Sequence, residues 1–265
     1  MAIQLGVLGV GHLASALLNG VFEHGVLTPD EVLLMDLDAD RPAAFAGRGC
    51  RVAGDAAALA SAPRLLLSVR PQSFADAASA LGDLDESHLV ISVMAGGTSE
   101  HIRATMGGAC RVVRAMPNTA AAIGESMTTI AAGATATDSD LQWTTTLFDA
   151  VGRTCVIDES LMSAATAVCG SGPGWLKLFG LALTEAAMDV GFDADTADRL
   201  VRQTLLGAAT TVRNSDQSFE ALLDAVATAG GTTEAGLDAM RSAGFEEAVR
   251  RGVIAARDRG DVLST

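Results

Sequence analysis

The chain has 265 residues, of which 49% are hydrophobic, and a formal net charge of −14. This length suits one large domain or two modest ones with a sizeable apolar core. The negative charge argues against a nucleic-acid partner, because phosphate binding needs a basic surface. No apolar run reaches the length of a membrane span and none follows a signal peptide, so we expect a cytoplasmic protein with no membrane partner.

The cysteines and histidines are too scattered to predict a metal site. They form neither a CxxC pair nor an HxxxH pair, the spacings that zinc sites commonly use. We therefore expect no bound metal and reduced cysteines that act as small buried apolar residues. These residues are Cys50, Cys110, Cys155, Cys169, His12, His24, His88 and His101.

The first elements of the chain predict a nucleotide-binding turn. Residues 3–10, IQLGVLGV, are typical of a buried parallel strand, and apolar residues at helical spacing follow directly. Gly9, Gly11 and Ala14 thus form GxGxxA between a strand and a helix. Gly9 permits the tight turn, Gly11 lets a pyrophosphate approach the backbone, and Ala14 lets the helix lie close to the strand. On these residues alone, a glycine-rich turn without a ligand is the alternative.

The end of the second predicted strand bears on the choice of cofactor. A second strand is expected at residues 31–35 and ends in Asp36. An acid at this place hydrogen-bonds the adenosine ribose and repels a 2′-phosphate. Arg41 lies nearby and partly offsets that repulsion. These residues predict NAD(H) or NADP(H) with NADH slightly favoured, and the alternative for Asp36 is a solvated acid in a turn.

Strands and helices then alternate, which predicts an α/β fold with a doubly wound sheet. Ligands of such sheets bind at the carboxyl ends of the strands, where this chain has SVRP at 68–71, AGG at 95–97 and PNT at 117–119. The further strands are expected at 64–69, 88–94, 110–115, 127–131 and 155–157, and helices at 74–81 and 99–105.

The second half of the chain is expected to be helical. Strand patterns stop near residue 163, and apolar residues recur at helical spacing in 172–190, 196–213, 219–227, 233–243 and 246–259. The sequence therefore predicts a Rossmann-type dinucleotide-binding domain at 1–160 and a helical domain at 161–265. These helices carry more apolar surface than about 100 residues bury alone, so we expect them to pack against another subunit.

One turn in the helical half combines two glycines with two threonines. It lies in AVATAGGTTEAGLDAM, residues 225–240. Gly230 and Gly231 predict a sharp backbone turn, and Thr232 and Thr233 are candidate caps for the next helix. Such a turn either only starts the helix or also binds an anion.

Several motifs together resemble the pyrroline-5-carboxylate reductase family over nearly the whole chain. The most specific is ATAGGTTEAGL at 227–237, and the others are GVGHLASAL, SVRP, MAGGT, RAMPNT and CGSGPGW. The resemblance implies a Rossmann domain followed by a helical dimerisation domain, with homodimers that often assemble into rings. It also implies reduction of a cyclic imine carboxylate, 1-pyrroline-5-carboxylate, to L-proline with NAD(P)H, the last step of proline biosynthesis.

The resemblance assigns roles to individual residues. The substrate carboxylate is expected on the N–H groups of Gly231, Thr232 and Thr233 at a helix N-terminus, where the dipole favours an anion. Thr233 is expected to act in catalysis, with its hydroxyl facing the ring nitrogen. The whole expected substrate site is Asn118, Ser171, Thr228, Gly230, Gly231, Thr232 and Thr233. The expected cofactor contacts, with Asp36 included, are Gly9, Gly11, His12, Leu13, Ala14, Asp36, Ser68, Val69, Arg70, Pro71, Ala95, Gly96 and Asn118.

The chain also departs from the usual family pattern. Arg70 replaces a lysine, Ala120 and Ala229 replace prolines, and Gly174–Trp175 replaces an Ala-Tyr pair. These departures leave a different cyclic or exocyclic imine acid as an alternative substrate.

Two other functions compete with the imine reductase. A β-hydroxyacid dehydrogenase shares the overall plan, and Lys177 is a candidate for its catalytic lysine, although it lies one residue too far along and the usual asparagines are missing. A non-catalytic nucleotide-binding protein, acting as a redox sensor or scaffold, is the second. The presence of both GxGxxA and GGTT argues against the latter.

Overall fold

The computed structural model describes residues 2–264. The chain divides into two compact units, of which unit 1 is Met1–Ser171 with Ile254–Thr265 and unit 2 is Gly172–Val253. The sequence predicts one boundary at residue 160, so the units differ from the expected domains. Unit 1 also includes residues 161–171 and the last turns of the final helix. No local sequence pattern indicates this return of the chain to unit 1.

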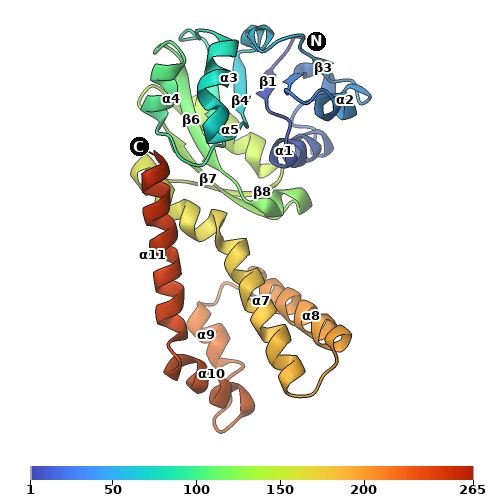
Figure 1. Ribbon diagram of the computed structural model, residues 1–265, viewed down its shortest axis with the longest axis vertical. Coiled ribbons are helices and arrows are strands. Elements are labelled where there is room, and N and C mark those ends of the chain that lie inside the picture. The colour runs from blue at the N-terminus through green and yellow to red at the C-terminus, as the bar shows by residue number, and fades with distance from the viewer. Residues whose placement is uncertain (1, 265) are drawn as a thin grey trace. The chain divides into compact units, whose positions relative to one another are not determined.

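Unit 1 is built on one eight-stranded sheet in the order β3-β2-β1-β4-β5-β6-β7-β8 (Figure 1). Neighbouring strands are parallel except β6 and β7, which are antiparallel. Every residue of β1 and β5 is buried, as expected where helices cover both faces of a parallel sheet. The strands are β1 (Leu5–Leu8), β2 (Val32–Met35), β3 (Arg51–Val52), β4 (Arg64–Leu67), β5 (Leu89–Ser92), β6 (Arg111–Met116), β7 (Ser126–Ala132) and β8 (Gly152–Val156).

Two separate hydrophobic clusters cover the two faces of the sheet. One cluster joins α1 and α5 to the strands, with Leu17 and Phe148 fully buried. The other joins α3 and α4, with Phe74 and Ile102 buried. This arrangement confirms the predicted doubly wound α/β fold. The helices are α1 (His12–Glu23), α2 (Asp40–Ala46), α3 (Phe74–Leu81), α4 (Ser99–Thr105), α5 (Asp138–Asp149), α6 (Met162–Ala165), α7 (Gly172–Asp189), α8 (Ala194–Arg213), α9 (Phe219–Asp224), α10 (Thr232–Ser242) and α11 (Phe245–Ser264).

Most of the expected elements are present with small shifts at their ends. The helices predicted at 74–81 and 99–105 match α3 and α4 residue for residue. The prediction missed β3, α2, α5 and α6, and it ended α11 at residue 259 although the helix extends to Ser264.

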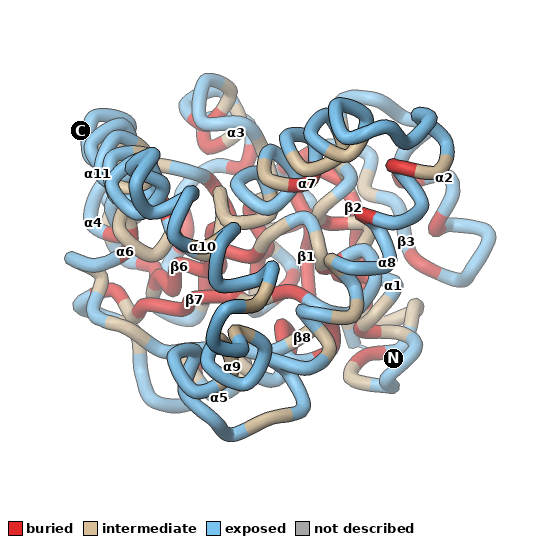
Figure 2. The backbone as a smooth tube through the Cα atoms, turned by 90° about the horizontal axis from the view of Figure 1, so that it is seen from below, coloured by how far each residue is buried: buried red, intermediate tan, exposed pale blue. Residues whose placement is uncertain are grey.

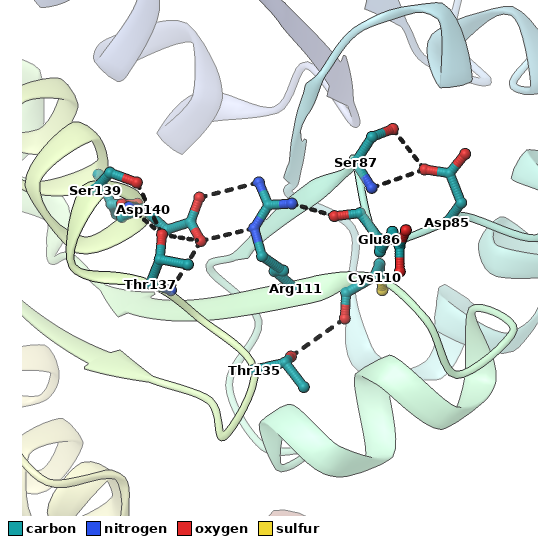
Figure 3. A network of polar contacts seen from close by, with 10 residues as sticks. Asp85, Glu86, Ser87, Cys110, Arg111, Thr135, Thr137, Ser139 and Asp140 are labelled. Carbon is teal, nitrogen blue, oxygen red and sulfur yellow. Dashed lines mark hydrogen bonds and ion pairs between the residues drawn. The ribbon is translucent and has the colours of Figure 1, made fainter.

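Arg111 ties β6 to α5 at the amino ends of the parallel strands (Figure 3). Its guanidinium donates to both carboxylate oxygens of Asp140, at 2.8 and 3.1 Å, and to the backbone carbonyl of Glu86. The Asp140 carboxylate also accepts from the backbone and hydroxyl of Thr137, the N-cap of α5. Burial alone would raise the pKa of Asp140, but these hydrogen bonds hold that pKa below its ordinary value.

A cavity of ≈ 480 Å³ lies beside this ion pair, where Arg64 stacks on the ring of Trp143. It is at the amino ends of the strands, the edge opposite the one where doubly wound folds bind ligands. We therefore assign the Arg111–Asp140 pair to the structure of the sheet, and the candidate functional site lies at the carboxyl ends of the strands.

Unit 2 buries almost nothing within one chain. Of residues 172–253, only Gly180, Ala197 and Val201 are buried, and no part of α9 or α10 is drawn as buried in Figure 2. Large apolar side chains stay accessible, among them Leu176 and Phe219, which are 64% and 76% exposed. An apolar helical surface of this extent is typical of a subunit interface.

Two further expectations concern the cysteines and the membrane. Cys50 and Cys110 are buried, and burial raises the pKa of each thiol. Cys155 is exposed and Cys169 half-buried, so the expectation of buried cysteines is wrong for Cys155. Within residues 2–264, no helix combines the length and apolar character needed to cross a membrane. The same residues contain no group of three or more potential metal ligands.

Candidate cofactor and substrate sites

The glycine turn between β1 and α1 has the geometry that dinucleotide binding requires. Gly9 has a φ of 94°, and a Cβ on it would lie 2.5 Å from the carbonyl oxygen of Ser68. Gly11 is the N-cap of α1 in extended conformation, and a Cβ there would meet nothing within 4 Å. Ala14 is fully buried. The turn is therefore closed against β4 at Gly9 and open over Gly11.

The first N–H groups of α1 face this open space without a side-chain cap. A helix N-terminus of this kind attracts phosphate, because its N–H groups lack intrahelical acceptors and its dipole is positive there. The open position at Gly11 and the uncapped helix together fit a pyrophosphate. His12 is exposed and Leu13 half-buried in the same first turn.

Asp36 lies at the end of β2 and is tied to the glycine turn. Its Oδ2 accepts the N–H of Val10 at 2.6 Å, and its Oδ1 accepts the N–H of Asp38 at 2.9 Å. Arg41 pairs with both acids, at 3.6 Å from Asp36 and 3.2 Å from Asp38. The Asp36 side chain is only 9% exposed. The acid is thus held beside the turn, and the nearby guanidinium partly neutralises its charge.

The segments after β4 and β5 lie at the same edge of the sheet. Ser68 contacts the glycine turn, as the geometry at Gly9 shows, while Arg70 is exposed ahead of Pro71. Ala95 and Gly96 line a cavity of ≈ 220 Å³.

Ser171 lines that same cavity, so the structure brings this expected substrate residue together with two expected cofactor residues. Asn118 belongs to the RAMPNT motif and caps the 3₁₀ turn Thr119–Ile123. Its amide donates to the carbonyl of Cys169 at 3.1 Å, and its Oδ1 accepts the N–H of Ala120 at 2.9 Å. Asn118 therefore connects the end of β6 to the CGSGPG motif.

The GGTT turn in unit 2 begins α10, but its details differ from the prediction. Gly231, not a threonine, is the N-cap, and it has no side-chain cap. The N–H of Gly231, expected to be free for an anion, donates to the carbonyl of Thr228 at 2.9 Å. A Cβ on Gly231 would lie 2.6 Å from the Thr228 hydroxyl, so this tight turn needs glycine. Gly230 has a φ of 72°.

Two of the three N–H groups expected to bind an anion therefore remain available. Thr232 and Thr233 are exposed in the first turn of α10, and no acceptor in the described part of the chain contacts their N–H groups. The prediction also missed Glu234, whose carboxylate accepts the N–H of Gly230 at 2.7 Å. A glutamate three residues after the N-cap was the sequence signal for this contact.

Lys177, the residue on which the dehydrogenase alternative depends, is exposed in α7 of unit 2.

Two family descriptions match the chain in the order of its units. Residues 4–96 match the family described as NADP oxidoreductase coenzyme F420-dependent. Residues 159–263 match the family described as pyrroline-5-carboxylate reductase dimerisation.

Full-length relatives give the same picture. Pyrroline-5-carboxylate reductase 2 of Bacillus subtilis is 32% identical over 93% of this chain and 90% of its own. The Methanosarcina acetivorans pyrroline-5-carboxylate reductase is 34% identical over 98% and 97%. Among solved structures, a pyrroline-5-carboxylate reductase from Coxiella burnetii is 28% identical, with a TM-score of 0.91 over 100% of both chains. A reductive aminase from Aspergillus terreus shares the fold at a TM-score of 0.63.

Proposed function

The chain belongs to the pyrroline-5-carboxylate reductase family, and on that basis we propose how its two units divide the work of the enzyme. It is an NAD(P)H-dependent oxidoreductase that reduces the C=N bond of 1-pyrroline-5-carboxylate to L-proline. Unit 1 holds the dinucleotide and unit 2 holds the substrate carboxylate. The observation that carries the first assignment is the glycine turn, closed at Gly9 and open over Gly11.

The residues of unit 1 fit a nicotinamide dinucleotide. The pyrophosphate lies over Gly11 against the N-terminus of α1, and the ribose lies near Asp36. Ser68, Val69, Arg70 and Pro71 line the cleft after β4, and Ala95, Gly96 and Asn118 border the nicotinamide. His12, Leu13 and Ala14 complete the pyrophosphate turn. NADH is favoured slightly over NADPH because the Asp36 carboxylate repels a 2′-phosphate, although Arg41 reduces that repulsion.

The residues of unit 2 fit a carboxylate. The N–H groups of Thr232 and Thr233 point from a helix N-terminus and lack acceptors in the described chain, so they supply two donors where the dipole favours an anion. Gly230, Gly231 and Thr228 shape the turn, and Ser171 and Asn118 belong to the substrate side of unit 1. The Thr233 hydroxyl faces the ring nitrogen.

The chemistry asks little of acid or nucleophilic side chains. A protonated imine carbon is already electrophilic, and bound NAD(P)H supplies the hydride. The protein's residues must hold the carboxylate, keep the ring oriented and exclude water from it. This need for positioning explains why the site consists of backbone N–H groups, small residues and hydroxyls.

The exposed apolar surface of unit 2 supports a homodimer formed through the helices of the C-terminal half. The proposal extends to a ring of such dimers, the assembly that the family resemblance implies. Because unit 2 buries three residues within one chain, its helices need a partner surface.

Proline at position 232 tests the carboxylate cradle. Thr232 is the first residue of α10, where proline fits the helix and removes one N–H. Gly231 before it has φ −85° and ψ 168°, which a following proline accepts. We expect Thr232→Pro to raise the KM for pyrroline-5-carboxylate about tenfold to a hundredfold, the loss of one hydrogen bond to a charged group.

The matched control is Thr232→Ala, which removes the side chain and keeps the N–H; its KM should stay near that of the wild type. Thr233→Val isolates the hydroxyl, and we expect it to lower kcat with little effect on KM. The assay measures imine reduction as the decrease in nicotinamide absorbance, with NADH and with NADPH. Equal KM values for Thr232→Pro and Thr232→Ala would exclude the cradle, and a wild type that oxidises neither cofactor would refute the assigned reaction.

A further inference from the structure

The loop between β5 and α4 contains two consecutive glycines, the residue type with the greatest conformational freedom. Its middle residues, Gly96 and Gly97, have φ values of 85° and 72°, a region that other residues rarely adopt. Under the proposed function this loop, residues 95–98, borders the nicotinamide. A glycine pair offers no side chain to fix that border, so its conformation must be fixed from outside.

One end of the loop is held by a partly buried ion pair. The N–H of Ser99, the first residue of α4, donates to the Glu159 carboxylate at 2.7 Å, and its hydroxyl donates to the other oxygen of the same group. Arg114, whose side chain is 6% exposed, pairs with Glu159 at 3.2 Å. This network fixes the start of α4 but leaves the two glycines without support.

The last turn of α11 supplies the missing support within unit 1. The N–H of Gly97 donates to the backbone carbonyl of Leu263 at 3.3 Å. A Cβ on Gly96 would lie 2.8 Å from the Leu263 carbonyl carbon, so the loop and the helix end are in close contact. Both segments also line the cavity of ≈ 220 Å³ that Ser171 borders.

The helix end is itself seated on α6. A Cβ on Gly260 would lie 3.1 Å from the Cβ of Ser163, which shows how closely the two helices approach. The Ser264 hydroxyl donates to the carbonyl of Gly260 at 2.9 Å and closes the last turn. The turn is thus packed on a helix of the same unit before it contacts the loop.

We propose that the last turn of α11, through the carbonyl of Leu263, is a positioning element that holds the loop 95–98 in the form that orients the nicotinamide. The inference rests on the proposed function for the identity of the bound group. Loss of the turn frees the glycine pair, so the nicotinamide loses orientation while the adenosine half, held at Gly11 and Asp36, does not. Misplacement of a reacting group by about 1 Å lowers turnover up to a hundredfold.

Removal of residues 263–265 tests this role. The shortened chain lacks the accepting carbonyl, whereas a matched chain that lacks only residue 265 keeps the Leu263 carbonyl and side chain. We expect faster amide hydrogen exchange in residues 95–98 of the shortened chain, a fall in kcat of about tenfold, and an unchanged affinity for ADP-ribose. The chain that lacks only residue 265 should exchange and turn over like the wild type.

A second pair of variants tests the same contact if the shortened chain fails to fold. Gly260→Leu forces the helix end away from Ser163, and Gly252→Leu places the same side chain on the same helix where a Cβ meets nothing within 4 Å. Only Gly260→Leu should raise exchange in the loop.

Unchanged exchange in both the shortened chain and Gly260→Leu would overturn the inference, whatever the activity. Faster exchange with unchanged kcat would also overturn it, because the loop would then be held for no catalytic purpose. A wild type that reduces no imine would overturn the proposed function instead, which keeps the two failures distinct.

Discussion

Alanine substitutions at the two glycines of the first turn should have different effects: Gly9→Ala should lower stability, and Gly11→Ala should weaken cofactor binding. In Gly9→Ala the new Cβ lies 2.5 Å from the carbonyl oxygen of Ser68 and 3.2 Å from a methyl of Val69, on a backbone with φ 94°. The positive φ alone costs an alanine about 1–2 kcal/mol. Relief of the backbone contact brings the loss of stability to about 3 kcal/mol.

A loss of this size corresponds to a fall in the melting temperature of about 6–12 °C in a chain of this length. In Gly11→Ala the Cβ enters open space on extended backbone, so the melting temperature should stay within about 1 °C of the wild type. The same methyl stands where the pyrophosphate approaches, and we expect the Kd for NADH to rise at least about tenfold.

Thermal unfolding followed by circular dichroism and NADH binding followed by fluorescence measure the two effects on the same samples. A Gly9→Ala protein that melts with the wild type would refute the steric argument at Ser68. A Gly11→Ala protein that binds NADH normally would show that the dinucleotide does not cross the turn at Gly11, and the cofactor assignment would fail with it.

Two other predictions follow from charged groups. Asp36→Asn keeps an acceptor for the N–H of Val10 but removes the charge, so the ratio of kcat/KM for NADPH to that for NADH should rise about tenfold. The control is Asp38→Asn, which removes the other acid paired with Arg41 and should leave this ratio closer to that of the wild type. Asp140→Asn should lower the free energy of unfolding by about 2 kcal/mol near neutral pH, because it breaks the pair with Arg111. The pKa of Asp140 is lowered in the folded protein, so its contribution to stability is present above the unfolded pKa of about 3.9 and is lost as the pH falls through the folded pKa. Denaturant titrations of the wild type and Asp140→Asn at pH 7 and pH 3 should therefore show a smaller difference in the free energy of unfolding at pH 3. A difference that is the same at both pH values would refute the assignment.

The strands and their carboxyl-end turns could be predicted because their signals are local. Each is a short apolar run that ends in glycine, proline or a polar residue, and the backbone geometry at Gly9 and Gly11 follows from the same few residues. Helix α5 was missed because its sequence, DSDLQWTTTLFD, has little apolar periodicity and several β-branched threonines. Its capping box, Thr137 with Asp140, was the signal that was available.

The GGTT turn shows a different limit. Its position at the start of a helix could be predicted from composition, but the choice of N-cap could not, since glycine and threonine both serve there. Gly231 takes the position because a side chain would collide with Thr228. That contact also uses the Gly231 N–H, and the expected three-donor cradle becomes two donors at Thr232 and Thr233.

The return of α11 to unit 1 had no local signal at all. The sequence around Gly260 suggests the end of a helix, whereas the structure continues it to Ser264 and seats its last turn on Ser163 and Gly97. Such contacts join residues far apart in the chain and depend on small side chains at both positions. The glycines at 96 and 260 therefore have a shared explanation: each allows the last turn of α11 to lie close to the edge of the sheet where the nicotinamide is proposed to bind.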